Sequence, residues 1–300
     1  MGRPAVSPPP RSSRGRRRIA FGWYGGKFSH LDWLLPLLPP SHHYVEPFGG
    51  SAAVLLNRPP SPVETYNDLD GELVNFFRVL RDEPGALVEA IGLTPFARAE
   101  FEAALAPAAP GTSDRERARR FFIRARQART GLAQTASQGR WAFCRGTSRA
   151  GMSGAVSRWL GSADGLSEIA GRLLRVQIEN RPALEVIARY DSPGTLFYCD
   201  PPYVPSTRGD PRAYGFEMDE VSHRRLAEAL GRCRGRAAVS GYECDLMDSL
   251  YAGWQRVPGP RRTAHSVKRP RQEFLWTNYP IGGPSDGRST RRSAARASGR

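Results

Sequence analysis

The sequence predicts an α/β fold, a Rossmann-like doubly wound mixed sheet of about seven strands with a helical insertion. Three observations lead to this prediction. Short apolar runs alternate with helical periodicity in the first and the last parts of the chain. A glycine-rich turn directly follows the first of these runs, as at the opening of a nucleotide-binding α/β unit. Between the two parts lies a segment rich in Ala, Arg and Gly with no convincing β run.

The two ends of the chain have a different composition from the rest. Residues 1–18 hold six Arg and no acid, and residues 284–300 hold five Arg and one Asp. The ends thus carry +6 and +4 of the net charge of +15, which leaves +5 for the middle. They are rich in Pro, Ser and Gly, and so cannot offset the entropy lost on ordering. We expect disordered basic tails, which either contact nucleic acid or only improve solubility.

The first part of the chain begins with a glycine-broken turn at residues 21–27 and a helix at 31–38, closed by two prolines. A short strand at 44–46 runs into a glycine turn at 47–51, which is followed by an apolar helix at 52–56. Adjacent glycines let the backbone approach a ligand closely at the start of a helix. In the first turn, Trp23 and Lys27 can stack on a ligand and bind its carboxylate, or be a core Trp and a surface Lys.

A second strand is expected at residues 63–66, followed by the sequence Asn-Asp-Leu-Asp and a helix at about 72–81. Asp68 comes about twenty residues after the glycine turn, where a ribose-binding carboxylate is expected. The alternative is an Asx turn or a helix cap made by Asn67, Asp68 or Asp70.

Residues 82–165 have helical spacing and are strongly basic near their centre. Arg117, Arg120 and Arg124 recur on one predicted helix face, and Arg140 and Arg149 follow in a loop. This pattern favours a DNA-binding surface, although a solvated charged helix face has the same spacing.

The α/β pattern returns after residue 165. We expect helices at about 181–190, 222–232 and 245–251, and strands at 176–178, 195–199, 237–240, 254–257 and 274–277.

The most specific motif is Asp200-Pro201-Pro202-Tyr203, directly after an apolar strand. Ligands bind at the carboxyl ends of strands in such sheets. The Asp200 carboxylate and the Pro201 carbonyl can accept the two hydrogens of an exocyclic amino group, which makes its nitrogen a better nucleophile. Proline fixes the backbone that carries the carbonyl, and Tyr203 offers a ring for a base to stack on.

Several classes of protein are disfavoured by the sequence. No apolar run is long enough for a membrane span or a secretory signal, so we expect a cytoplasmic protein. The four cysteines are far apart and have no His partner at metal spacing, so we expect reduced cysteines and no metal.

Taken in order, these motifs resemble the Dam-like DNA adenine methyltransferases, which use S-adenosylmethionine. The motifs are W-Y-G-G-K at 23–27, E-P-F-G-G-S at 46–51, N-D-L-D at 67–70 and D-P-P-Y at 200–203. The likeness extends to Ser240-Gly241-Tyr242, residues 250–254 and residues 273–276, and so covers roughly residues 20–280.

The resemblance implies a site-specific enzyme that methylates N6 of adenine in double-stranded DNA after base flipping. Residues 19–81 and 166–283 would be its catalytic domain, and 82–165 its target-recognition insertion. Asp200, Pro201, Pro202 and Tyr203 would be catalytic, and Arg117, Arg120, Arg124, Arg140 and Arg149 would bind DNA. The cofactor-binding residues would be Trp23, Lys27, Glu46, Phe48, Gly49, Asp68 and Asp200. We expect a monomer or weak dimer, either solitary or paired with a restriction enzyme.

The sequence departs from the family near Pro182, where relatives often carry an acid that contacts the cofactor's adenine. Glu179 or Asn180 can take that role here. Two alternative functions are a methyltransferase acting on RNA or on N4 of cytosine, and a catalytically silent DNA-binding homologue.

Overall fold

The centre of the molecule is a seven-stranded sheet with the strand order β5-β2-β1-β6-β7-β9-β8. The structure is a computed structural model and describes residues 17–149, 151–207, 216–260 and 272–281. The strands are β1 (His43–Glu46), β2 (Val63–Asn67), β5 (Gln177–Glu179), β6 (Thr195–Cys199), β7 (Arg236–Tyr242), β8 (Gln255–Pro258) and β9 (Glu273–Thr277). Neighbours from β5 to β7 are parallel, and β9 is antiparallel to β7 and β8. The predicted mixed α/β sheet is confirmed.

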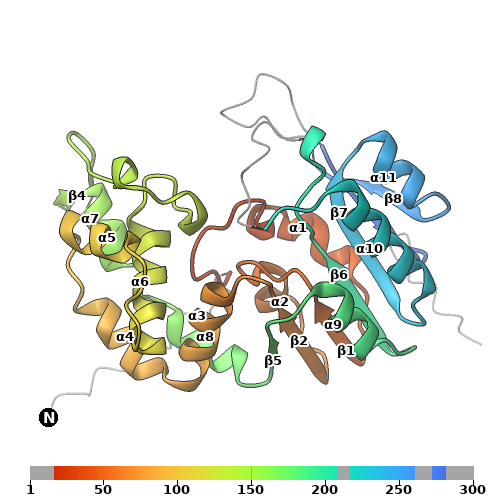
Figure 1. Ribbon diagram of the computed structural model, residues 1–300, viewed down its shortest axis with the longest axis horizontal. Helices are drawn as coiled ribbons and strands as arrows, with labels where there is room; N and C mark the ends of the chain where they lie inside the picture. Colours follow the sequence, from red (N-terminus) through yellow and green to blue (C-terminus); the bar gives the residue numbers. More distant parts are fainter. Residues whose placement is uncertain (1–16, 150, 208–215, 261–271, 282–300) are drawn as a thin grey trace, which may run out of the picture.

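Both faces of the sheet are covered, because successive side chains of a strand point to opposite faces. Tyr44 and Val45 of β1 are both fully buried, yet they belong to separate apolar clusters. The cluster around Tyr44 includes α1 (Leu31–Leu34), α2 (Ala53–Asn57) and α3 (Gly71–Asp82). The cluster around Val45 includes α9 (Ala183–Tyr190), α10 (Glu220–Arg232) and α11 (Asp245–Leu250), which lie along one side of the sheet in Figure 1. The sheet is therefore doubly wound.

Some element ends differ from the predicted ones by a few residues. The helix expected at 31–38 is α helical only to Leu34 and continues as the 3-10 helix η2 (Leu35–Leu37), because Pro36 cannot donate a backbone hydrogen bond. Helix α9 begins after Pro182 rather than at residue 181. Helix α10 begins two residues before the predicted start, since the Asp219 side chain accepts a hydrogen bond from the backbone N–H of Ser222.

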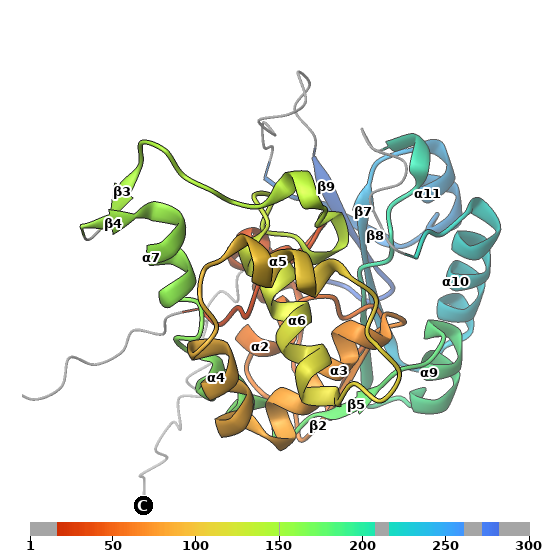
Figure 2. The same ribbon diagram turned by 60° about the vertical axis from the view of Figure 1, so that its left-hand side comes forward.

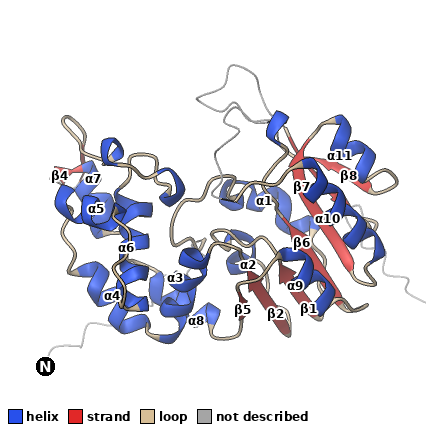
Figure 3. Ribbon diagram, in the orientation of Figure 1, coloured by secondary structure: helices blue, strands red, loops and turns tan. Residues whose placement is uncertain are grey.

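Helices make up most of the half of the molecule beside the sheet, as Figure 3 shows. Besides α3, they are α4 (Pro84–Gly92), α5 (Arg98–Leu105), α6 (Asp114–Gln127), α7 (Gly154–Leu160) and α8 (Leu166–Leu173), with the 3-10 helices η3 (Ala133–Thr135) and η4 (Gln138–Arg140). The expectation that residues 82–165 hold no β structure is corrected by a short antiparallel pair, β3 (Ser148–Arg149) and β4 (Met152–Ser153). The remaining 3-10 helices are η1 (Lys27–His30) and η5 (Pro205–Thr207).

Helix α6 is the central helix of this half, where it packs against α3 (Figure 2). It begins after Ser113, whose side chain accepts a hydrogen bond from the Glu116 N–H, and acids occupy its first turn. The buried residues Ala118, Phe121, Phe122 and Ala125 recur at helical spacing on one face. The ring of Phe122 stacks on Phe76 of α3 with centroids 5.6 Å apart. The helical half thus packs on α3, the helix that follows β2.

The basic tails predicted at 1–18 and 284–300 lie outside the described residues, except for Arg17 and Arg18. Arg18 is tied to the domain, because its backbone N–H donates to Oδ1 of Asn57 at 2.8 Å. In the described ranges, no helix has both the length and the apolar character needed to span a membrane.

Candidate active site

The four sequence motifs meet at one cavity, at the edge of the sheet where β1, β2 and β6 end. This is the edge where ligands bind in doubly wound sheets. Among the residues that line the cavity are Trp23, Lys27, Glu46, Phe48, Gly49, Gly50, Asp68, Asp70, Asp200 and Pro202. Segments almost 180 residues apart in sequence thus contribute to one concave site.

The glycine turn after β1 is shaped by the neighbouring strand β2. A Cβ atom at Gly49 would overlap the ring of Tyr66. Gly50 has a φ of +49°, and a Cβ atom there would lie 2.8 Å from Cδ1 of Trp23. Both positions therefore require glycine, which leaves the turn's backbone open to the cavity.

The two acids after β2 have different roles. Asp70 is the N-cap of α3, where its Oδ1 accepts hydrogen bonds from the backbone N–H groups of Glu72 and Leu73. Asp68 lines the cavity and accepts from the N–H groups of Gly50 at 2.8 Å and Asp70 at 2.9 Å. Burial raises the pKa of Asp68 to about 6, although these hydrogen bonds oppose the rise. Asp70 is thus the helix cap, and Asp68 is the acid proposed to bind the ribose.

Asp200 lies at the end of β6 and is held from two sides. Lys27 Nζ is 2.7 Å from its Oδ2, and the Ser240 hydroxyl donates to its Oδ1 at 2.8 Å. Burial raises the pKa of Asp200, Lys27 lowers it and the nearby Glu273 raises it, so the pKa stays above the usual value for aspartate. The carboxylate is fixed in position and more basic than an exposed one.

Lys27 is not a surface residue. Its side chain is 2% exposed, and Nζ also donates to the Gly25 carbonyl at 2.5 Å. Burial lowers the pKa of Lys27, but Asp200 and Glu273 outweigh this effect and raise it. The ammonium group therefore stays charged and lies at Asp200, which was not among the contacts foreseen for it.

Tyr203 is largely buried, with 4% of its surface exposed. Its ring lies edge-on to Tyr242 at 4.8 Å between centroids, and Lys27 Nζ is 5.0 Å from the ring centre. Pro202 lines the cavity, and Pro201 is buried. The four residues of the motif thus form a tightly packed corner.

Glu46 lines the cavity at the end of β1 and is buried, and its Oε1 accepts a hydrogen bond from the Tyr44 hydroxyl at 2.7 Å. Burial raises the pKa of Glu46 to about 8, and the hydrogen bond from Tyr44 lowers it only in part. Near neutral pH the Glu46 carboxyl group is therefore mostly protonated.

The cavity also contains residues that sequence reasoning did not find. Phe216 and Met218 line it, as does Gln134 from η3 in the helical half. Both polar atoms of the Gln134 amide are buried and lack a hydrogen-bond partner within the described residues. No local pattern marks these residues. The packing of the helical half brings Gln134 to the site, whereas Phe216 and Met218 lie in the segment that leads from the D-P-P-Y motif to α10.

The segment near Pro182 makes other contacts than the one expected. Asn180 Nδ2 donates to the carbonyls of Asp68 at 2.8 Å and Leu69 at 3.2 Å, and so holds the turn that carries the ribose acid. Glu179 accepts from the Tyr190 hydroxyl at 2.6 Å. Arg181 and Ala183 line the cavity instead.

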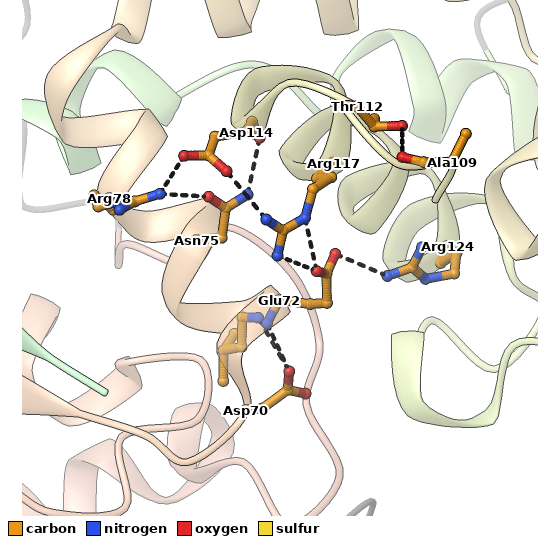
Figure 4. Close-up of polar contacts among 10 residues, drawn as sticks. Asp70, Glu72, Asn75, Arg78, Ala109, Thr112, Asp114, Arg117 and Arg124 are labelled. Carbon is orange, nitrogen blue, oxygen red and sulfur yellow. Dashed lines mark hydrogen bonds and ion pairs between the residues drawn. The ribbon is translucent and has the colours of Figure 1, made fainter. Parts of the chain in front are cut away.

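The arginines proposed for DNA fall into two groups. Arg117 donates from Nε to Glu72 at 3.0 Å, and Arg124 lies 4.0 Å from the same carboxylate (Figure 4). Arg120 donates to the carbonyl groups of Ala103 and Ala106. Arg140 and Arg149 are exposed, and within the described residues neither side chain has an ion-pair partner. That these arginines contact DNA remains a prediction.

Comparison with known proteins shows the family that the chain resembles. A family model for the D12 class N6 adenine-specific DNA methyltransferase matches residues 23–265. The DNA adenine methylases of two Vibrio cholerae strains are 26% identical over 257 residues, which is 80% of this chain and 87% of theirs. The type II methyltransferase M1.LlaDCHI of Lactococcus lactis is 35% identical over 68 residues, which is 22% of this chain and 24% of that protein.

Proposed function

This chain belongs to the D12 class of N6 adenine-specific DNA methyltransferases, and we propose that the cavity beside β1, β2 and β6 is where it methylates adenine. Enzymes of this class are adenine-specific DNA methyltransferases, EC 2.1.1.72. The observation that carries the proposal is the position of Asp200. It lies at the end of β6, 2.7 Å from Lys27 and in the same cavity as the glycine turn and Asp68.

The residues of the cavity fit S-adenosylmethionine, the methyl donor of this family. At Gly49 and Gly50 the cavity is lined by backbone without a side chain, which lets a ligand approach closely. The Asp68 carboxylate suits ribose hydroxyls, and Trp23 and Phe48 offer apolar surface. Glu46 suits a cationic group, since a cation favours its ionised form. When bound, the cofactor supplies an electrophilic methyl group.

Asp200 and the Pro201 carbonyl would accept the hydrogens of the adenine amino group. These contacts direct the lone pair of the nitrogen toward the methyl group. As the nitrogen gains the methyl group it loses a proton, and Asp200 is the carboxylate placed to accept that proton. Ser240 and Lys27 keep the carboxylate group from rotating, because they hold both of its oxygens.

Target recognition is assigned to the helical half. The adenine must leave the DNA stack to reach a cavity of this kind. Arg140 and Arg149 are exposed beyond α6, where phosphates or base edges can approach them. Gln134 joins this region to the cavity itself. Residues 82–165 are therefore proposed to read the sequence around the target adenine.

The proposed site is tested with labelled S-adenosylmethionine and unmethylated duplex DNA, digested to nucleosides after the reaction. The wild-type protein should yield labelled N6-methyl-2′-deoxyadenosine. Asp200→Asn, which keeps the size of the side chain, should lose about 10²–10⁴-fold in rate and retain DNA binding. A variant that turns over normally would remove Asp200 from the reaction. Preferred labelling of RNA or of cytosine would indicate one of the alternative methyltransferases.

A further inference from the structure

Glu273 is a buried acid at the edge of the active site that the reaction described above does not use. It begins β9, where it pairs with Tyr242 of the antiparallel neighbour β7. The residue is 7% exposed, and its Oε1 lies 3.8 Å from Lys27 Nζ. Its Oε2 has no hydrogen-bond partner in the described part of the chain and lies 3.9 Å from His30 Nε2. An acid in such a place is costly unless a nearby cation compensates it.

Lys27 is the cation that Glu273 shares with Asp200. The ammonium group has three hydrogens, and two of its near neighbours are the Gly25 carbonyl and Asp200. Glu273 is the second carboxylate within ion-pair distance, with Oε1 at 3.8 Å, and the Tyr203 ring lies 5.0 Å from Nζ. A lysine with acids on two sides is held between them, whereas a lysine with one acid can swing on its flexible stem.

We propose that Glu273 is a positioning residue for methyl transfer, which holds Lys27 against Asp200 and keeps Asp200 basic enough to accept the amino proton. One ammonium group between two carboxylates leaves an excess of negative charge. A simple Lys27–Asp200 pair would be neutral and its carboxylate a weaker base.

Other groups also face Asp200 and must be considered for any pH dependence. Those that act on Asp200 are Lys27 from η1, Glu273 from β9, Glu46 from β1, Tyr198 and Cys199 from β6, and Ser240 from β7. Tyr242 from β7 acts on Lys27, and His30 from η1 lies 3.9 Å from Glu273. Among these, Glu273 is the acid that raises the pKa of both members of the Lys27–Asp200 ion pair. It is therefore the residue whose neutralisation should change the basicity of Asp200 most specifically.

The test is the pH profile of single-turnover methyl transfer at saturating S-adenosylmethionine and DNA. Glu273→Gln keeps the side-chain volume and removes the charge. It should lower the plateau rate about three- to tenfold and shift the acidic limb of the profile to lower pH, because Asp200 then ionises more readily. Glu273→Asp keeps the charge and should leave the limb near its wild-type position. Glu243→Gln is the matched control, since Glu243 pairs with Arg256 on the surface.

Three results would overturn the inference. One is an unchanged rate and limb in folded Glu273→Gln. Another is a slower rate with an unmoved limb, which indicates a structural role. The third is a loss of S-adenosylhomocysteine affinity that accounts for the whole effect. The inference rests on the proposed site, but different results refute the two proposals. A fully active Asp200→Asn variant would refute the proposed site, whatever the Glu273 variants show.

Discussion

The backbone N–H of Gly50 donates to Oδ2 of Asp68 at 2.8 Å, so the turn after β1 and the acid after β2 form one unit. The bond fixes the carboxylate at the wall of the cavity. It also connects Asp68, which is proposed to bind the ribose, to the glycine turn. Cofactor binding should therefore depend on the ionisation of Asp68.

We predict that affinity for S-adenosylhomocysteine weakens as the pH falls through about 6. Burial raises the pKa of Asp68 to about 6, so the acid is charged above that pH and becomes neutral below it. A neutral carboxyl group accepts hydrogen bonds from ribose less well than a carboxylate. Calorimetry from about pH 5 to 8 should show a slope of at most about tenfold per pH unit on the acidic side.

The control for this prediction is Asp68→Asn. It should bind more weakly at all pH values and lose the pH dependence assigned to Asp68. If the wild-type affinity is flat across this range, Asp68 does not bind the cofactor as a carboxylate.

Cofactor binding should also release a proton at neutral pH. The pKa of Glu46 is raised to about 8, mainly by burial, so the free protein holds Glu46 mostly protonated at pH 7. A cationic cofactor near Glu46 would stabilise its carboxylate and lower this pKa. The number of protons released follows from calorimetry in buffers of different ionisation enthalpy.

Glu46→Gln should abolish this proton release, whereas Glu89→Gln on α4 should not affect it. Release that persists in Glu46→Gln would assign the proton to another group.

The local motifs of the site could be predicted because each consists of neighbouring residues, and three of the four lie at the end of a strand. The glycine turn, Asp68 and Asp200 all lie at the same edge of the sheet, as their positions after strands required. Glu273 and Gln134 could not be found in this way. Glu273 reaches Lys27 only because β9 inserts antiparallel beside β7, and Gln134 reaches the cavity only through the packing of η3.

Side-chain partners were harder to foresee than elements. The spacing of Arg117 and Arg124 correctly places both on one side of α6, but it says nothing of Glu72, which lies 45 residues from Arg117 and faces it from α3. Likewise, a lysine after a glycine turn is expected to be exposed. In the fold, however, Lys27 is buried close to Asp200 and Glu273. Tertiary contacts decide such cases.

The two groups of arginines should differ in the salt dependence of DNA binding. Arg140→Ala and Arg149→Ala should each lower the slope of log affinity against log salt by about 0.9, because each loses a phosphate contact. Arg117→Ala should leave the slope nearly unchanged, since its guanidinium group is engaged by Glu72 and Asp114 (Figure 4). Fluorescence anisotropy with a labelled duplex between about 50 and 200 mM salt measures these slopes. A change in slope for Arg117→Ala alone would place DNA on the α3 and α6 side.

The strongest structural effect is expected at Arg172, a buried residue of α8. Its guanidinium group forms a two-pronged ion pair with Glu64 of β2, at 2.5 and 2.7 Å, and donates to the Leu55 carbonyl of α2 at 2.9 Å. Arg172→Ala would leave the fully buried Glu64 with the Arg58 guanidinium group at 3.6 Å and the hydrogen bond from the Ser61 N–H at 3.1 Å as its remaining partners among the described residues. Removing one partner of such a pair costs about 3–5 kcal/mol, which urea unfolding would measure directly. Arg175→Ala is the control, because Arg175 is exposed two residues beyond the end of the same helix and makes one hydrogen bond, to the Ser61 carbonyl at 3.2 Å, so its loss should change stability by at most about 1 kcal/mol. Equal losses in the two variants would show that Arg58 and the Ser61 N–H suffice to compensate Glu64.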